Sequence, residues 1–128
     1  MNNKIEFNKI VRVVGDLIFN NDDEQPNVIF KVVDLDVDID NLDEKALSTM
    51  CYNVIEEGSH ARASFKYLEN GIKVGIEGDF FIQAFDVNGQ TVQRKCIYAS
   101  RVTFIEYPKK LRVAKGKSLF EKHAEKLV

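Results

Sequence analysis

The feature that most constrains the fold is a tight turn, Asp86-Val87-Asn88-Gly89, between two long segments suited to β-strands. Asn-Gly tolerates the positive backbone angles that two-residue hairpin turns require. Residues 72–85 and 91–107 on either side are rich in β-branched and aromatic residues, which strands favour. We therefore expect a long antiparallel hairpin, around which the rest of the chain must build a β-sheet.

Three more strands are expected before this hairpin. The first covers residues 9–19, and its internal Gly15 is typical of a bulge or bend. The second begins at Val28 and continues in strict alternation to Asp40, so that aspartates line one face and aliphatic residues the other. The third covers residues 50–55. This pattern predicts a half-buried, acid-faced second strand.

A short helix is expected between the third strand and the hairpin. Ser59 is placed to cap its beginning, and Asn70-Gly71 ends it, because glycine accepts the left-handed conformation common at helix ends. Three strands, one helix and a two-stranded hairpin are the element order of the five-stranded OB-fold, a partly open Greek-key barrel. The sequence thus predicts an all-β OB-fold domain over residues 1–108.

The remaining residues, 109–128, are predicted to form a basic tail. The capping box that begins at Ser118 indicates a short amphipathic helix within it. This segment carries seven bases against two acids, whereas residues 16–57 carry twelve acids against Lys31 and Lys45. The net charge of -2 hides this asymmetry, and a polyanion should be drawn to the basic part and repelled by the acidic one.

Three segments resemble the bacterial-type single-stranded DNA-binding protein family. Asn8 to Leu17 has the family's asparagine-lysine pair, aliphatic run, glycine and leucine. Gly58 to Phe80 has a helix ending in tyrosine-leucine, a glycine turn and an aliphatic-Glu-Gly strand, and Val102 to Glu106 resembles the closing strand. The resemblance covers about residues 8–107. It implies an OB-fold homotetramer that coats single-stranded DNA during replication, recombination or repair.

The same resemblance indicates candidate binding residues. Phe85 falls where the family has a tryptophan at the tip of the fourth strand, and alternation places Phe81 on the same face. A stacked base contributes about 1 to 3 kcal/mol, although either ring could instead be buried at a subunit interface. Tyr52, Tyr98 and Tyr107 are weaker candidates. The cations expected to contact phosphates are Arg94, Lys95, Arg101, Lys109, Lys110 and Arg112.

The sequence departs from the family in three respects. It has no tryptophan, and the family's third-strand aromatic positions are here Cys51 and Glu57. It ends in Lys126-Leu127-Val128 instead of an acidic tail finishing in proline-phenylalanine, so we expect a phage, plasmid or paralogous variant. These departures leave open an alternative, an OB-fold protein-interaction module or accessory replication factor with weak or no nucleic-acid binding.

Other motifs in the sequence are incomplete. The aspartates from Asp34 onward have the spacing of a calcium loop, but Ile39 stands where glycine is needed and Lys45 where the bidentate acid is needed. Gly116-Lys117-Ser118 lacks the earlier glycine of a phosphate-binding loop. No catalytic constellation is present either. We therefore expect a binding protein that is not an enzyme and has no metal or cofactor.

The composition also bears on location. The two cysteines, Cys51 and Cys96, are far apart in sequence and are expected to be buried, reduced thiols. No stretch approaches the roughly 20 apolar residues of a membrane helix, and the first residues lack the apolar run of a secretion signal. The expected protein is cytoplasmic, without membrane contact, and has single-stranded DNA as its partner, with RNA as an alternative.

Overall fold

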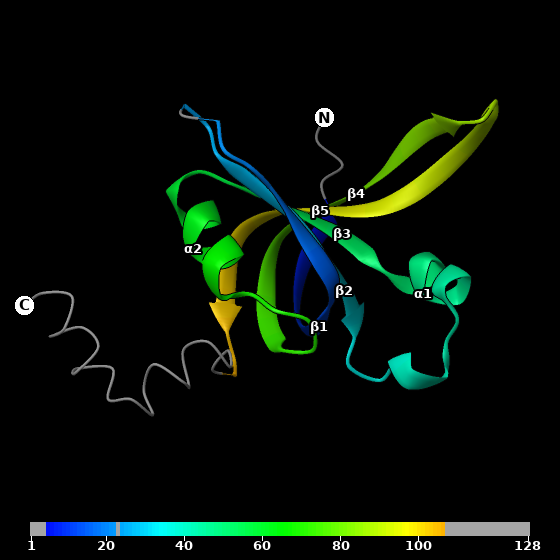
Figure 1. The fold of residues 1–128 in the computed structure, drawn as a ribbon, viewed down its shortest axis with the longest axis horizontal. Helices are drawn as coiled ribbons and strands as arrows, with labels where there is room; N and C mark the ends of the chain where they lie inside the picture. Colours follow the sequence, from blue (N-terminus) through cyan, green and yellow to red (C-terminus); the bar gives the residue numbers. More distant parts are fainter. Residues whose placement is uncertain (1–4, 23, 107–128) are drawn as a thin grey trace, which may run out of the picture.

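The computed structural model describes residues 5–22 and 24–106, and five strands close into a barrel (Figure 1). The strands are β1 (Ile5–Asn20), β2 (Asn27–Asp34), β3 (Tyr52–Glu57), β4 (Lys73–Val87) and β5 (Gln90–Phe104). Around the barrel their order is β1-β2-β3-β5-β4, and only β3 and β5 run parallel. The predicted five-stranded barrel, with a helix between β3 and β4, is confirmed.

The hairpin of β4 and β5 turns at Asn88-Gly89, as predicted. Both residues have positive φ, 52° and 79°, which is the geometry of a two-residue turn matched to strand twist. Among the described residues, β4 pairs with β1 only up to Phe80, and β5 pairs with β3 only from Cys96. Residues 81–95, hereafter the arm, therefore pair only with each other and project beyond the barrel wall (Figure 1).

The barrel core is aliphatic and comes from the inward side of every strand. Alternation buries one side chain in two, because successive side chains point to opposite faces of a sheet. The largest fully buried side chains, with less than 2 % exposure, are Val11, Val13, Val28, Phe30, Val32, Val33, Val54, Leu68, Val74, Ile76 and Ile97. Most of them form one cluster inside the barrel, and Phe7, Ala61, Ile72 and Ala99 complete it.

Two glycines shape the strands. Gly15 has a φ of 80°, and the pairing of β1 with β2 shifts register between Val14 and Ile18, so the predicted bulge is confirmed. Gly78 lies where the pairing of β4 with β5 shifts register, between Glu77 and Gly78. A Cβ added there would overlap the Tyr98 carbonyl oxygen and lie 2.8 Å from the Cα of Ala99. The close approach of these two backbones therefore requires glycine at position 78.

The segment after β2 differs from the prediction. The strand ends at Asp34, and the acid-faced extension to Asp40 is wrong. A turn begins where the Val37 amide donates to the Asp34 carbonyl oxygen, at 3.1 Å. A 3-10 helix, η1 (Ile39–Asn41), and an α-helix, α1 (Glu44–Met50), follow.

Aspartate chemistry explains the difference. Short acidic side chains bond to nearby backbone amides and so favour turns and helix caps over strands. Asp43 does this at the start of α1, where its Oδ1 accepts from the Ala46 amide at 2.7 Å. The aliphatic residues of the segment, Val37, Ile39 and Leu47, pack on a second small cluster of Val14, Val33 and Cys51.

The helix between β3 and β4 is α2 (Ser59–Tyr67). The helix begins at Ser59, so its N-cap is Gly58 and not Ser59 as predicted; the φ of Gly58 is 97°, which favours glycine. The helix ends before the predicted Asn70-Gly71 turn, and Gly71 has a φ of 96°. Within the described ranges, no helix is long and apolar enough to span a membrane. The predicted C-terminal helix lies outside the described residues.

A buried carboxyl lies beneath α2. Glu56 on β3 is 5 % exposed, and its Oε1 has no hydrogen-bond partner among the described residues. Burial raises the pKa of Glu56, while a hydrogen bond from Ser64 and the nearby His60 oppose that rise. The folded protein thus favours the protonated carboxyl more than the unfolded chain does.

Replacing Glu56 with glutamine is expected to stabilise the protein near neutral pH. The stability that protonated Glu56 contributes is complete below its ordinary pKa of 4.5 and is lost as pH rises through the higher folded-state pKa. In urea denaturation from pH 4.5 to 7, the free energy of unfolding of the variant should rise relative to that of the wild type. The variant should be more stable by about 1 kcal/mol at pH 7. Glu57→Gln, on the opposite face of β3, is the control. A stability difference that is constant with pH would contradict the prediction.

Candidate nucleic-acid interface

An aromatic ring and a guanidinium lie together on the arm. The register sets Phe85 opposite Val92 and Gln83 opposite Arg94, so Phe85 and Arg94 are diagonal neighbours on one face. The Arg94 Cζ lies 4.8 Å from the centre of the Phe85 ring. Both groups are planar, and Arg94 is exposed. A base can therefore extend this stack from the guanidinium side, through contacts that do not depend on base identity.

Beside this pair, the outer face of the barrel has an apolar pocket of about 470 Å³. Its apolar lining includes Ile18, Ile29, Ile55 and Phe85, on four different strands. Ile18 is 61 % exposed, so the pocket has an aliphatic rim that is open to solvent. Its polar lining residues are Asp16, Lys31, Asn53, Gln83 and Arg94.

A cleft continues from the pocket between α1 and β5. It measures about 260 Å³ and shares Lys31, Asn53 and Arg94 with the pocket. The Asn53 amide donates to the Lys95 carbonyl oxygen at 3.2 Å and so fixes the base of the arm to β3. Ser48 and Thr49 at the end of α1 form the opposite wall. The outer face thus presents an open groove with apolar, polar and cationic lining.

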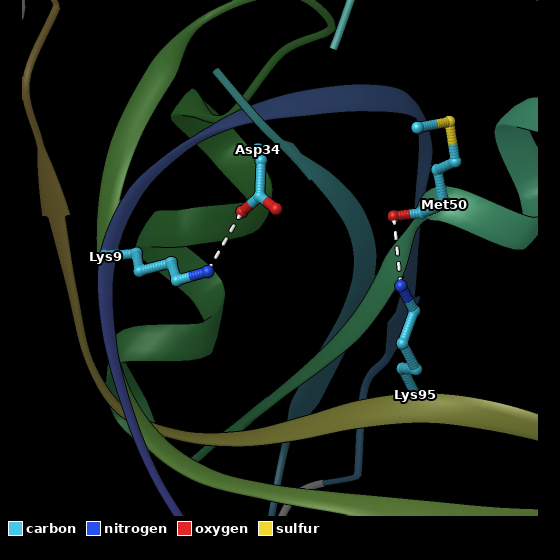
Figure 2. Close-up of polar contacts among 4 residues, drawn as sticks. All are labelled: Lys9, Asp34, Met50 and Lys95. Carbon is cyan, nitrogen blue, oxygen red and sulfur yellow. Dashed lines mark hydrogen bonds and ion pairs between the residues drawn. The ribbon is translucent and has the colours of Figure 1, made fainter. Parts of the chain in front are cut away.

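Two of the predicted cations lie away from Phe85. Lys95 follows Arg94 directly but points to the other face of β5, where its Nζ donates to the Met50 carbonyl oxygen at 3.5 Å (Figure 2). Arg101 follows Arg94 by seven residues, about 23 Å along the strand β5. It forms an ion pair of 3.8 Å with Glu77. The structure therefore brings Phe85 and Arg94 together but separates the other two from them.

Some of the remaining predicted residues lie within the described ranges and the others lie outside them. Phe81 lies on the same side of β4 as Phe85, opposite Cys96, and is partly exposed, but it does not line the pocket. Lys109, Lys110 and Arg112 lie outside the described residues, as do Tyr107 and Pro108. Tyr98, a weaker candidate, is exposed on β5 opposite Asp79.

Sequence reasoning missed Lys31 and the isoleucines of the pocket. The signal was present in β2, where Val28, Phe30 and Val32 are buried. Alternation turns Ile29 and Lys31 outward, and an outward aliphatic residue becomes part of a binding surface only when others join it in one patch. The pocket also needs Ile18 and Ile55 from two other strands, and no local pattern shows that these meet Ile29.

Both cysteines are buried and free, as predicted, and both border the groove. Burial raises the pKa of the Cys51 thiol and also that of Cys96, against the opposing charge of Arg94 on Cys96. The two thiols are therefore protonated near neutral pH and act as small apolar groups. Within the described ranges, no three His, Cys, Asp or Glu side chains are grouped to hold a metal ion.

A closed five-stranded barrel with a helix between β3 and β4, and with a groove framed by β2, β3 and the arm, defines an OB-fold. Solved structures share this fold. A small single-stranded DNA-binding protein from Streptomyces coelicolor matches with a TM-score of 0.63 at 18% identity, over 80% of this chain and 95% of its own. The chain therefore has the OB-fold found in single-stranded DNA-binding proteins.

Two further structures agree. A mitochondrial single-stranded DNA-binding protein from S. cerevisiae has a TM-score of 0.58 and 9% identity, over 83% of this chain and 99% of its own. The single-stranded DNA-binding domain of a Synechococcus protein has a TM-score of 0.53 and 14% identity, over 77% and 92% respectively. No protein-family model matches the sequence, and neither does any curated protein. The likeness thus lies in the fold, at identities too low to carry function.

Proposed function

We propose that this chain binds single-stranded DNA in the groove framed by β2, β3 and the arm, without catalysing a reaction. The observation that carries the proposal is the pairing of Phe85 with the Arg94 guanidinium at 4.8 Å, beside an apolar pocket that Lys31 also lines. Flat groups next to cations suit a ligand of alternating bases and phosphates. Relatives in fold whose names specify single-stranded DNA support the same ligand.

The groove favours single strands over duplex for a physical reason. A base must leave its stack and pairing partner before its face can meet Phe85 or enter the pocket between the isoleucines. In a duplex the base faces are covered by neighbouring base pairs, and only the edges are accessible in the grooves. The aliphatic pocket wall and the planar pair make no demand on base identity, so binding should tolerate any sequence.

The wider biological role is also part of the proposal. We propose a homo-oligomer, most simply a tetramer, that coats single strands during replication, recombination or repair in the cytoplasm, with RNA as an alternative ligand. Ile10 and Ile105 support association, because they are 49 % and 48 % exposed and lie near each other around Gly75. Light scattering on the purified protein measures the mass and tests this part directly.

An acidic wall beside the groove favours a second candidate, a protein-interaction module. Glu44 of α1 borders a hollow together with Lys31. The stretch between β2 and α1 also carries several exposed aspartates. Carboxylates at this position repel phosphates and attract cationic side chains. A partner protein with a basic surface would then bind where the leading proposal places DNA.

Fluorescence anisotropy with labelled oligo-dT and a duplex of equal length, at two salt concentrations, separates the two candidates. We expect the single strand to bind more tightly and to lose affinity as salt rises, with a log-log slope of about 0.7 per phosphate contact. Equal affinity for both forms would contradict binding in the groove. Absence of binding at low salt would favour the interaction module.

A further inference from the structure

Two lysine ammonium groups meet at one tyrosine ring on the face of the sheet opposite Phe85. The Nζ of Lys95 lies 4.5 Å from the centre of the Tyr52 ring, and the Nζ of Lys9 lies 6.0 Å from it. Lys9 extends from β1 and Lys95 from β5, so two separate parts of the barrel bring their charges to this ring. We call this place, formed by Lys9, Tyr52 and Lys95, the mouth site.

The ring of the mouth site is held in place by its neighbours. Phe7 packs on Tyr52 edge-on with centroids 5.1 Å apart, and Phe80 does the same at 6.1 Å. Such edge contacts stabilise aromatic pairs and fix the plane of the ring. Farther out, Ile82 lies opposite Lys95 on the hairpin and is 49 % exposed, and Ile5 lies opposite Phe80 and is 58 % exposed. The mouth site thus combines a fixed ring with an exposed aliphatic rim.

The positive charge of the mouth site is only partly compensated. Lys9 forms an ion pair of 3.5 Å with Asp34, but both side chains are substantially exposed, at 52% and 37% (Figure 2). An exposed pair of this kind contributes little to stability, so it can be exchanged for another anion at small cost. Lys95 donates to the neutral carbonyl oxygen of Met50 at 3.5 Å. An incoming phosphate would replace Asp34 beside Lys9 and would give Lys95 the negative charge that the Met50 carbonyl does not supply.

We infer that the mouth site binds a second nucleotide of the same strand, with its base against Tyr52 and Ile82 and its phosphate between Lys9 and Lys95. The inference rests on the proposed function and adds the course that the bound strand takes from Phe85 to the mouth site. The cleft between α1 and β5 is bordered by both Arg94 and Lys95, whose side chains point to opposite faces of β5. A single strand that enters at Phe85 therefore passes through this cleft and reaches the mouth site.

The length of the strand provides the test. An OB-fold accommodates about 4 to 16 nucleotides, so oligo-dT of about 4 nucleotides should occupy the groove at Phe85 and one of about 16 should reach both places. Removing both charges by Lys9→Gln with Lys95→Gln should lower the log-log salt slope by about 0.7 for the long strand, because one phosphate contact is lost. The same pair of substitutions should leave the slope for the short strand unchanged.

A matched control removes two charges elsewhere. Arg62→Gln with Lys66→Gln does so on α2, where Lys66 lies over the Tyr67 ring at 5.4 Å, much as Lys95 lies over Tyr52. This control should change neither slope. Tyr52→Leu, which keeps an apolar side chain but removes the ring, should weaken binding of the long strand alone without altering its slope. Melting curves establish that each variant is folded.

Three results would overturn the proposed mouth site. A long-strand slope that is unchanged in the Lys9 and Lys95 variant would overturn the mouth site while leaving groove binding intact. An equal loss of slope for both lengths would also overturn it, because the lysines would then act on the first nucleotides. If the wild-type protein binds neither length, the proposed function itself fails, and the mouth site fails with it.

Discussion

Phe85→Ala is expected to weaken binding of single-stranded oligo-dT by about 1 to 3 kcal/mol, which corresponds to about 5- to 150-fold. The ring stacks against Arg94 and lines the apolar pocket, so its loss removes a platform and part of a wall. The dependence of affinity on salt should stay nearly the same, because a base contact releases no counterions. Anisotropy titrations at two or more salt concentrations measure both quantities.

Phe65→Ala is the matched control for this variant. Phe65 is an exposed ring, at 43 %, that lies on α2 and is stacked on Phe19 at 4.9 Å. Its loss should leave affinity for oligo-dT unchanged even if it lowers the melting temperature. Normal binding by a folded Phe85→Ala protein would show that the stacking assignment is wrong, and Phe81 would become the next ring to test.

Gly78→Ala should strongly destabilise the barrel, because among the described glycines only Gly78 would place a Cβ within 3.0 Å of other atoms. Its Cβ would overlap the Tyr98 carbonyl oxygen and press on the Cα of Ala99, both of which belong to the backbone of β5. Backbone cannot move aside as the end of a flexible side chain can, so β4 and β5 must separate locally. We expect a loss of about 3 kcal/mol in the free energy of unfolding, measured by urea denaturation.

Gly75→Ala provides the comparison on the same strand. A Cβ at position 75 meets the side chain of Thr103 at 3.7 Å, which is an ordinary contact. This variant should keep near wild-type stability, because alanine also restricts the unfolded chain more than glycine does. Equal stability of the two variants would contradict the close approach of β4 and β5 at Gly78.

The parts of the fold that could be predicted are those set by local chemistry. The turn at Asn88-Gly89, the bulge at Gly15 and the turn at Gly71 each depend on a backbone angle that few residues other than glycine and asparagine adopt. Alternation then identified the strands between these points. Because strands, turns and one helix came in the order of an OB-fold, the barrel could be predicted before any pairing was known.

The acidic segment after β2 shows where local patterns fail. From Asp34 to Asp40 the alternation of acids with aliphatic residues has the period of a strand, yet this stretch forms turns and a 3-10 helix. The alternation favours a strand, whereas aspartate side chains favour turns and helix caps, and the period of the pattern does not show which preference is stronger. The packing of Val37 and Ile39 outside the barrel prevails, and Asp43 then caps the start of the following helix α1.

The candidate site was only partly predictable for a different reason. Phe85 and Arg94 come from a single hairpin, so alternation and register together could place them side by side. The mouth site joins Lys9 to Tyr52 and Lys95, which are 43 and 86 positions further along the chain. Contacts of that range depend on how the barrel closes, and no pattern within one segment specifies them.

The arm has a consequence for how tightly any ligand can be held. Residues 81–95 form a ribbon with one partner strand each, and an isolated two-stranded ribbon is marginally stable in water. Local opening of the native state therefore costs less free energy in this ribbon than in the closed wall, where every strand has two partners. Phe85 and Arg94 lie on the part of the sheet that opens first. A ligand that binds them must keep the ribbon in its paired form, and the conformational entropy lost in doing so lowers the measured affinity.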